Sequence, residues 1–296
     1  MINRILDFSE APARLRVRYA QLIVQREDLP EVSLSLSDLA VVIVAHPQVT
    51  FTQAVLSGLA AVGGVFVTCD ERRLPVGMLL PLAAHHAQAE RFAAQARAPL
   101  PVRKRLWRQI VCAKIKAQAA LLMELQGDDH GIGVLALHVR SGDPSNLEAR
   151  AARRYWPRLF ADLDFRRHRE NEDQNILLNY GYAVLRAIIA RAVCAAGLHP
   201  SLGIHHHNRY DAFCLADDLM EPYRPTVDRA VAEYMSTHDE VYKLEAAAKQ
   251  HIIGELTGRY LVDGQQRTLF DTAARMASSL AEVFLGNAED LELPDW

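Results

Sequence analysis

Three short polar clusters carry side chains from which a cation site could be built. Glu148 stands at the start of an arginine-rich segment, and three consecutive histidines, His205 to His207, follow a loop that contains glycine. Asp218, Glu221 and Arg224 recur at intervals of three, so on a helix they would share one face. Carboxylate oxygen and imidazole nitrogen, without a thiolate, are donors typical of Mg²⁺ or Mn²⁺ rather than of structural zinc.

Each cluster also has an ordinary structural explanation. Ser145 precedes Glu148 by three residues, which is the spacing of a helix capping box. Histidines in a loop are usually surface residues, and the third cluster could be a charge pair at a helix end. Asp217 is expected to point away from Glu221 and to be solvated. If the three clusters instead meet, a bound ion could polarise a phosphoryl oxygen and activate an attacking oxygen.

Basic residues are concentrated beside the first cluster. Between Glu148 and Arg169 seven arginines stand against three acids, namely Arg150, Arg153, Arg154, Arg158, Arg166, Arg167 and Arg169. A second basic run consists of Arg103, Lys104, Arg105, Arg108, Lys114 and Lys116. Such runs are either solvated helix faces or contacts for a phosphate backbone. Residues 270–296 hold six acids and one arginine, which indicates a solvated end or a docking segment for a basic partner.

The composition limits the class of protein. The chain has 296 residues, of which 50% are hydrophobic and 23% charged, as is ordinary for a globular protein. These proportions exclude intrinsic disorder, a collagen-like repeat and a disulfide-rich scaffold. The formal net charge of -3 excludes a protein that coats nucleic acid through bulk positive charge, but it is compatible with a local basic patch.

The cysteines and the apolar segments indicate a cytoplasmic protein. Cys69, Cys112, Cys194 and Cys214 are not spaced as CxxC, and each lies in an apolar stretch. We therefore expect buried free thiols, which suit a reducing compartment. The first residues lack the apolar core of a signal peptide, and no stretch of about 20 uncharged apolar residues is present, so we expect no membrane span.

Hydrophobic periodicity predicts an α+β fold in two parts. Residues 1–80 are expected to form a β-rich domain, with half-buried strands near 15–19 and 32–36 and fully buried strands over 39–45 and 65–68. One short helix is predicted over 54–61. Residues 81–101, which several prolines bracket, are interpreted as a partly helical linker.

Residues 102–296 are predicted to form a larger all-α domain that carries the three clusters. The first helix begins near Val102, because apolar residues recur there at intervals of three and four. Further helices are predicted over about 146–163, 172–196, 226–236, 239–261 and 267–285.

Long motifs around these clusters resemble those of a known family, CRISPR-associated protein one, of the kind found in type II systems. The motifs are LWRQIVCAKIKAQ at 106–118, GDPSNLEARAARRYW at 142–156, LNYGYAVLR at 178–186, GLHPSLGIHH at 197–206 and LADDLMEPYRP at 215–225. VTFT at 49–52 and CDERRLP at 69–75 extend the similarity to the first part of the chain.

The resemblance implies a fold, an activity and partners. The family has a β domain followed by a helical domain. It inserts short DNA segments, called spacers, into the CRISPR array by attack of a DNA 3′-hydroxyl on a phosphodiester. The implied partners are double-stranded DNA (prespacer and repeat), a second copy of the chain joined through the β domain, CRISPR-associated protein two and the type II effector nuclease.

The resemblance also implies roles for individual residues. The metal-binding glutamate of the family falls on Glu148, the histidine of its G-x-x-H pattern on His206, and its distal acid on Glu221. These three would hold Mg²⁺ or Mn²⁺ and act in catalysis, with Asp218 as a supporting ligand. Arg150, Arg153, Arg154, Arg158 and Arg224 would contact DNA phosphates.

Two other functions stay open on the sequence. A metal-dependent DNA endonuclease without integration would use the same ion with water as the nucleophile. A non-catalytic DNA-binding scaffold would use the acids and histidines for structure alone.

Overall fold

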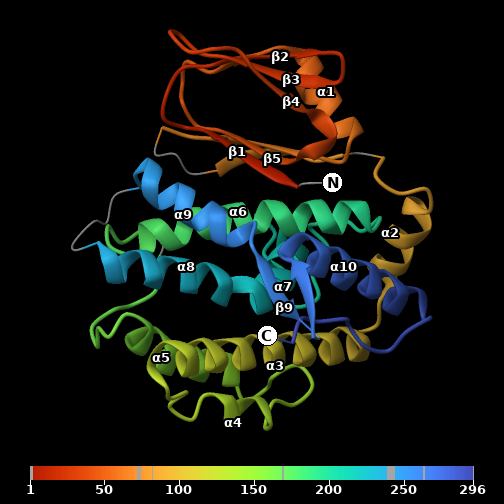
Figure 1. The fold of residues 1–296 in the computed structure, drawn as a ribbon. Helices are drawn as coiled ribbons and strands as arrows, with labels where there is room; N and C mark the ends of the chain where they lie inside the picture. The colour runs from red at the N-terminus through yellow and green to blue at the C-terminus, as the bar shows by residue number, and fades with distance from the viewer. Residues whose placement is uncertain are drawn as a thin grey trace.

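A strand-rich region followed by a mostly helical one makes up the computed structural model, as the α+β prediction requires (Figure 1). The structure describes residues 3–71, 75–81, 83–168, 170–238, 244–262 and 264–295. The first region contains β1 (Arg4–Phe8), β2 (Arg14–Arg18), β3 (Gln21–Gln25), β4 (Val32–Ser35), β5 (Leu39–Val44), β6 (Thr50–Phe51), α1 (Gln53–Ala61), β7 (Val65–Cys69) and β8 (Pro75–Leu79). The second contains α2 (Gln88–Arg97), α3 (Leu100–Gln126), α4 (Gly133–Ala136), α5 (Leu147–Leu159), α6 (Asn175–Ala195), α7 (Cys214–Met220), α8 (Arg224–Thr237), α9 (Ala246–Leu256), β9 (Arg259–Val262), β10 (Gln265–Thr268) and α10 (Leu269–Leu285).

Two four-stranded sheets make up the strand-rich region. One has the order β4-β3-β2-β6, and the other has the order β1-β5-β7-β8, with β1, β5 and β7 parallel and β8 antiparallel. Val42 and Val44 of β5 face the core between the sheets, whereas Val41 and Ile43 belong to the core of the helices. Because both faces of β5 are covered, its residues form a continuous apolar run rather than an alternating one.

The helix α6 connects the helical region to the strand-rich region through its contacts with β5 and β7. It lies directly beneath the β1-β5-β7-β8 sheet, and α3 lies on the far side of the helices (Figure 1). By length and composition α6 could cross a membrane, but 72% of its most apolar window is buried in this structure. It is therefore a core helix, against which α7, α8, α9 and α10 pack.

The structure differs from the pattern prediction in two respects. The helix expected over 239–261 is the shorter α9, followed by the β9–β10 hairpin, and residues 239–243 lie outside the described residues. The strands β1, β3, β6 and β8 have no counterpart among the predicted elements. In the segment interpreted as a partly helical linker, the helical part is α2, which packs against α10.

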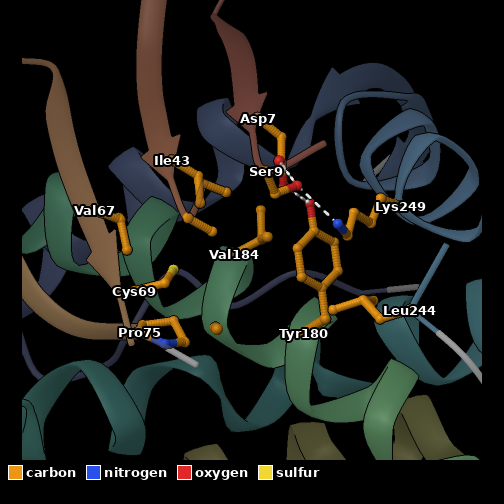
Figure 2. Close-up of a pocket in the computed structure, with 12 residues that line it drawn as sticks. Asp7, Ser9, Ile43, Val67, Cys69, Pro75, Tyr180, Val184, Leu244 and Lys249 are labelled. Atoms are coloured by element: carbon orange, nitrogen blue, oxygen red, sulfur yellow. Dashed lines mark hydrogen bonds between the residues drawn. The ribbon is translucent and has the colours of Figure 1, made fainter. Parts of the chain in front are cut away.

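A buried polar seam joins the two regions (Figure 2). Tyr180 of α6 donates a hydrogen bond to Asp7 at 2.6 Å, and Lys249 of α9 donates to Ser9 at 2.7 Å. Ser9 also bonds to Asp7, so the four side chains form one network. The cavity beside them measures about 10 Å³, which is space for one water molecule. The seam holds the end of β1 against α6 and α9.

A second buried network ties α5 to α6 and α8. The Asp228 carboxylate accepts hydrogen bonds from Tyr155, at 2.8 Å, and from Tyr182. Burial raises the pKa of Asp228 to about 6, even though both tyrosine hydrogen bonds lower it. Because burial likewise raises both tyrosine pKa values well above 10.0, the two hydroxyls remain donors.

This network makes the stability of the protein depend on pH in a defined direction. The pKa of Asp228 is higher in the folded chain than the ordinary 3.8, so the folded state holds the extra proton between about pH 4 and pH 6, and stability falls as pH rises through that window. Asp228→Asn removes this titration. We expect the difference in free energy of unfolding, variant minus wild type, to rise by about 3 kcal/mol as the pH increases through this window. Urea unfolding at several pH values measures this difference.

The exposed Asp164→Asn variant serves as the control. It removes an exposed carboxylate that lies outside this network. A difference for Asp228→Asn that changes with pH no more than that of the control would contradict the assigned pKa.

Candidate active site

One ammonium group links two of the predicted site residues. Lys114 Nζ of α3 lies 2.6 Å from Glu148 Oε1 and 2.6 Å from Glu221 Oε2. Glu148 belongs to α5, which packs against α3, and Glu221 opens the short turn Glu221–Tyr223 between α7 and α8 (Figure 1). Two carboxylates from distant stretches therefore converge on one point of α3.

The local fold at the start of α5 turns Glu148 toward this point. Asn146 caps the helix by accepting a hydrogen bond from Ala149 N, and Asp143 accepts from Leu147 N and Glu148 N. The capping-box explanation is therefore wrong, because Asp143 and Asn146 satisfy the first amides. The Glu148 carboxylate is instead bonded to Lys114.

Charge pairing keeps Glu221 ionised although it is buried. Burial alone would raise the pKa of Glu221, but Arg224 and Lys114 outweigh it and hold this pKa well below its usual range. Arg224 Nε lies 3.0 Å from Glu221 Oε1. In turn Glu221 and Glu148 keep the pKa of the buried Lys114 above its ordinary value, against the opposing effect of burial. The four charges thus stabilise one another.

His206 lies near enough to the two glutamates for both of their charges to affect its pKa. Its Nδ1 lies 2.6 Å from Asp218 Oδ1. This hydrogen bond raises the pKa of His206, and the nearby charges of Glu221 and Glu148 act in the same direction. His205 instead stacks flat on Trp107, with the ring centres 4.1 Å apart, and His207 is exposed.

Asp218 lies on the Nδ1 side of the His206 ring. Its carboxylate is completely buried and accepts hydrogen bonds from Ile204 N, His205 N and His206 N as well as from the imidazole. These four donors engage both oxygens. Asp218 therefore holds in place the loop that carries the histidines. Because Nδ1 of His206 is bonded to Asp218, the other ring nitrogen of His206 points away from Asp218.

A steric constraint explains why the G-x-x-H pattern needs glycine at its first position. A Cβ on Gly203 would lie 2.3 Å from the carbonyl oxygen of His206 and 3.0 Å from Cys214 Cβ. Gln95 of α2 supports the same loop, because its side chain bonds to His199 N, His199 O and Leu202 O. The segment interpreted as a linker thus helps to position His206.

The predicted DNA-contacting arginines divide into two groups. Arg150, Arg153 and Arg154 are exposed on α5, and Arg158 is half-buried beside them. Arg224 faces inward, with its guanidinium 4.7 Å from the centre of the Tyr182 ring. Arg169 lies outside the described residues.

Two expectations about charged residues are wrong. Asp217 is not solvated, since it is buried and Arg186 holds it through two hydrogen bonds of 2.6 and 2.7 Å. Lys114 is not on a solvated basic face, because it lies on the buried stripe of α3 with Ile110, Ala117 and Leu121. A lysine at an apolar position of that helical repeat is the signal that could have identified it.

The donor set suits a divalent cation. The carboxylates of Glu148 and Glu221 converge on Lys114, and the Glu221 atom that Lys114 touches, Oε2, is buried without a hydrogen bond of ordinary geometry. Among the described residues no three His, Cys, Asp or Glu side chains form a ready-made metal cluster. The Lys114 ammonium instead lies between the two glutamates, where it contributes one positive charge.

The fold is that of a defined class of proteins. A casposase bound to integration product has a TM-score of 0.78 with this chain at 19% identity, covering 97% of this chain and 92% of that one. A Cas1 protein from Thermotoga maritima has a TM-score of 0.75 at 14% identity, covering 96% and 97%. The chain therefore has a fold that it shares with a Cas1 protein and with a casposase.

Sequence comparison places it within that class. The family model described as CRISPR associated protein Cas1 matches residues 8–243. The chain is 36% identical over 285 residues to the CRISPR-associated endonuclease Cas1 of Neisseria meningitidis serogroup C, covering 95% of this chain and 93% of that protein. It is 28% identical over 272 residues to an endonuclease Cas1 of Pyrobaculum aerophilum, covering 84% and 91%. The chain belongs to the Cas1 family, and the resemblance found in its motifs is confirmed.

The steric role of Gly203 can be tested directly. In Gly203→Ala the added methyl group must displace the His206 backbone, so we expect a loss of about 1–3 kcal/mol in the free energy of unfolding. The His206–Asp218 hydrogen bond should weaken, and the pKa of His206 measured by NMR should fall back toward its ordinary value. Gly254→Ala, where a Cβ meets nothing within 4 Å, is the matched control. An unchanged His206 titration would refute the argument.

Proposed function

We propose that this chain is a DNA integrase dependent on Mg²⁺ or Mn²⁺, which joins short DNA segments to the CRISPR array. The observation that carries the proposal is the convergence of Glu148 and Glu221 on Lys114, with His206 close enough for both glutamates to raise its pKa. Such a site can act on a phosphodiester, and its residues come from three distant segments of the chain.

The comparisons support a reaction in which DNA strands are joined or cut. The structural neighbour of highest similarity quoted above is a casposase bound to integration product, which favours strand joining. The curated relatives are named endonucleases, so cleavage without joining is the second candidate function. Both use the same residues and differ in the nucleophile, which is a DNA 3′-hydroxyl in the first and water in the second.

Glu148, Glu221 and His206 would hold the ion. When bound there, a divalent cation supplies Lewis-acid stabilisation of the charge that develops on the phosphate, typically worth several kcal/mol. Asp218, which the resemblance assigned as a supporting ligand, fits better as the residue that orients His206, because its oxygens are engaged by the loop. Lys114 would move away from the two carboxylates as the ion enters.

The remaining side chains would place the DNA. Arg150, Arg153, Arg154 and Arg158 on α5 present positive charge to a phosphate backbone, which fixes the register of DNA but does not identify its sequence. Arg224 would counter phosphate charge beside Glu221.

The proposed partners follow from the family. Structures with the same fold are described as a Cas6-RT-Cas1–Cas2 complex and a Cas1–DNA complex. By analogy this protein would bind double-stranded DNA and CRISPR-associated protein two. We further propose a cytoplasmic homodimer joined through its β domain, which works with the type II effector nuclease, because integration at two strands needs two active sites.

The function is tested by Glu148→Gln in an assay that distinguishes joined from merely cut products. A labelled prespacer is incubated with a supercoiled array plasmid and Mn²⁺. Loss of one ion ligand should reduce integration roughly a hundredfold or more. The exposed Glu289→Gln is the control, and matching melting temperatures verify folding. Integration by Glu148→Gln at the control rate would remove Glu148 from the site, and cut but unjoined DNA from the wild type would favour the endonuclease.

The role of Lys114 predicts a metal response that does not depend on activity. In Lys114→Met the two glutamates lose a shared cation, so the variant should be less stable by about 3 kcal/mol without a divalent ion. Because no ammonium must be displaced, Mn²⁺ should raise its melting temperature more than it raises that of the wild type. Lys116→Met, an exposed position two residues along α3, is the matched control. Equal responses to Mn²⁺ in all three proteins would contradict this role.

A further inference from the structure

Three aromatic rings meet beside the candidate active site. Trp107 of α3 is 2% exposed, and the His205 ring lies flat against it, with 4.1 Å between the ring centres and 3° between the ring planes. His206 stands edge-on to both, with its ring centre 5.7 Å from that of Trp107 and 5.5 Å from that of His205. The loop that carries the histidines is therefore packed onto α3 through its rings.

The stack attaches this loop to the helix face that also holds the two glutamates. Trp107 precedes Lys114 by seven residues, which is two helical turns, so both side chains lie on the buried face of α3. Lys114 pairs with Glu148 and Glu221. One face of α3 thus fixes two carboxylates directly and, through the stacked His205, the loop that brings the next histidine.

Asp218 alone does not determine the orientation of the His206 ring. Its hydrogen bond of 2.6 Å fixes the position of Nδ1, but a bond to one ring atom leaves the imidazole free to rotate about it. The rings of Trp107 and His205 stand at 86° and 84° to the His206 plane and limit this rotation. Asp218 therefore fixes one nitrogen, and the two neighbouring rings fix the plane.

The structure gives His205 the part of a flat ring. The residue is exposed, and the contacts of its ring are with two other rings, those of Trp107 and His206. A phenyl ring has the same flat shape without the two nitrogens. It should therefore replace the imidazole in this stack, whereas a methyl group should not.

We propose that the stack of His205 on Trp107 sets the plane of the His206 ring and so makes its Nε2 available as an ion ligand. That nitrogen would bind the cation together with Glu148 and Glu221, so the inference rests on the proposed function. Trp107 and His205 are then positioning residues, which act on the ion only through His206. Residues that orient a ligating histidine typically contribute ten- to a hundredfold to metal affinity.

Two substitutions of one exposed residue separate the ring from its nitrogens. His205→Phe keeps a flat ring, and His205→Ala removes it. His207→Ala, at an exposed position in the same loop, is the matched control. The affinity of each full-length protein for Mn²⁺ alone is measured from the electron paramagnetic resonance signal of the free ion. Equal melting temperatures in EDTA verify that the variants fold.

We expect His205→Ala to weaken Mn²⁺ binding about tenfold or more, while His205→Phe and His207→Ala stay within about twofold of the wild type. Wild-type affinity in His205→Ala would overturn the proposal. A loss in His205→Phe as large as in His205→Ala would overturn it too, because the nitrogens of His205 would then be needed and the residue would itself be a ligand.

A measurement in EDTA separates this inference from the proposed function. Nuclear Overhauser contacts between the ring protons of Trp107 and His206 report the orientation of the His206 ring without any ion. They should persist in His205→Phe and disappear in His205→Ala, and their persistence in His205→Ala would refute the positioning role. If the wild type binds no Mn²⁺, the metal-dependent function fails, and these contacts decide the positioning role by themselves.

Discussion

The contact of Lys114 with Glu148 and Glu221 is the interaction on which the rest of the helical region depends. Two carboxylates brought together inside a protein repel each other and lose their hydration, so they need a cation to stay ionised. Lys114 and Arg224 supply two positive charges for these two negative ones. This balance allows α3, α5 and the α7–α8 turn to meet at one point. It also makes that point a place where an incoming divalent cation would find two carboxylates that already converge.

Asp218 and Glu221 show how neighbouring acids on one helix face acquire different tasks. They stand three residues apart, yet the carboxylate of Asp218 accepts hydrogen bonds from three backbone amides and an imidazole, whereas that of Glu221 is paired with Lys114 and Arg224. The difference arises because the loop after Gly203 folds back over Asp218. Gly203 permits this close approach, so the glycine, His206 and Asp218 form one local structural unit.

Sequence patterns predicted the elements in which buried apolar residues recur at a regular spacing along the chain. The buried strand β5 and the helices α3, α5, α6, α8 and α10 all lie close to their predicted ranges. The family motifs indicated Glu148, His206 and Glu221. The patterns failed where the decisive partner lies far away in sequence. The basic run that contains Lys114 indicates a solvated face or a contact for a phosphate backbone, whereas in the structure Lys114 pairs with a residue 34 positions away. Asp217 was expected in solvent because Arg186 could not be recognised as its partner.

The helix α6 explains why the two regions act as one structure. Its Tyr180 faces the polar seam with Asp7, its Tyr182 bonds to Asp228, and its Arg186 bonds to Asp217. These residues lie within two turns of one buried helix, so a displacement of the strand-rich region would be transmitted to the side chains around Arg224. The strand-rich region therefore does more than any part it plays in association. It sets the position of β8, and β8 in turn shapes the surface next to the candidate active site.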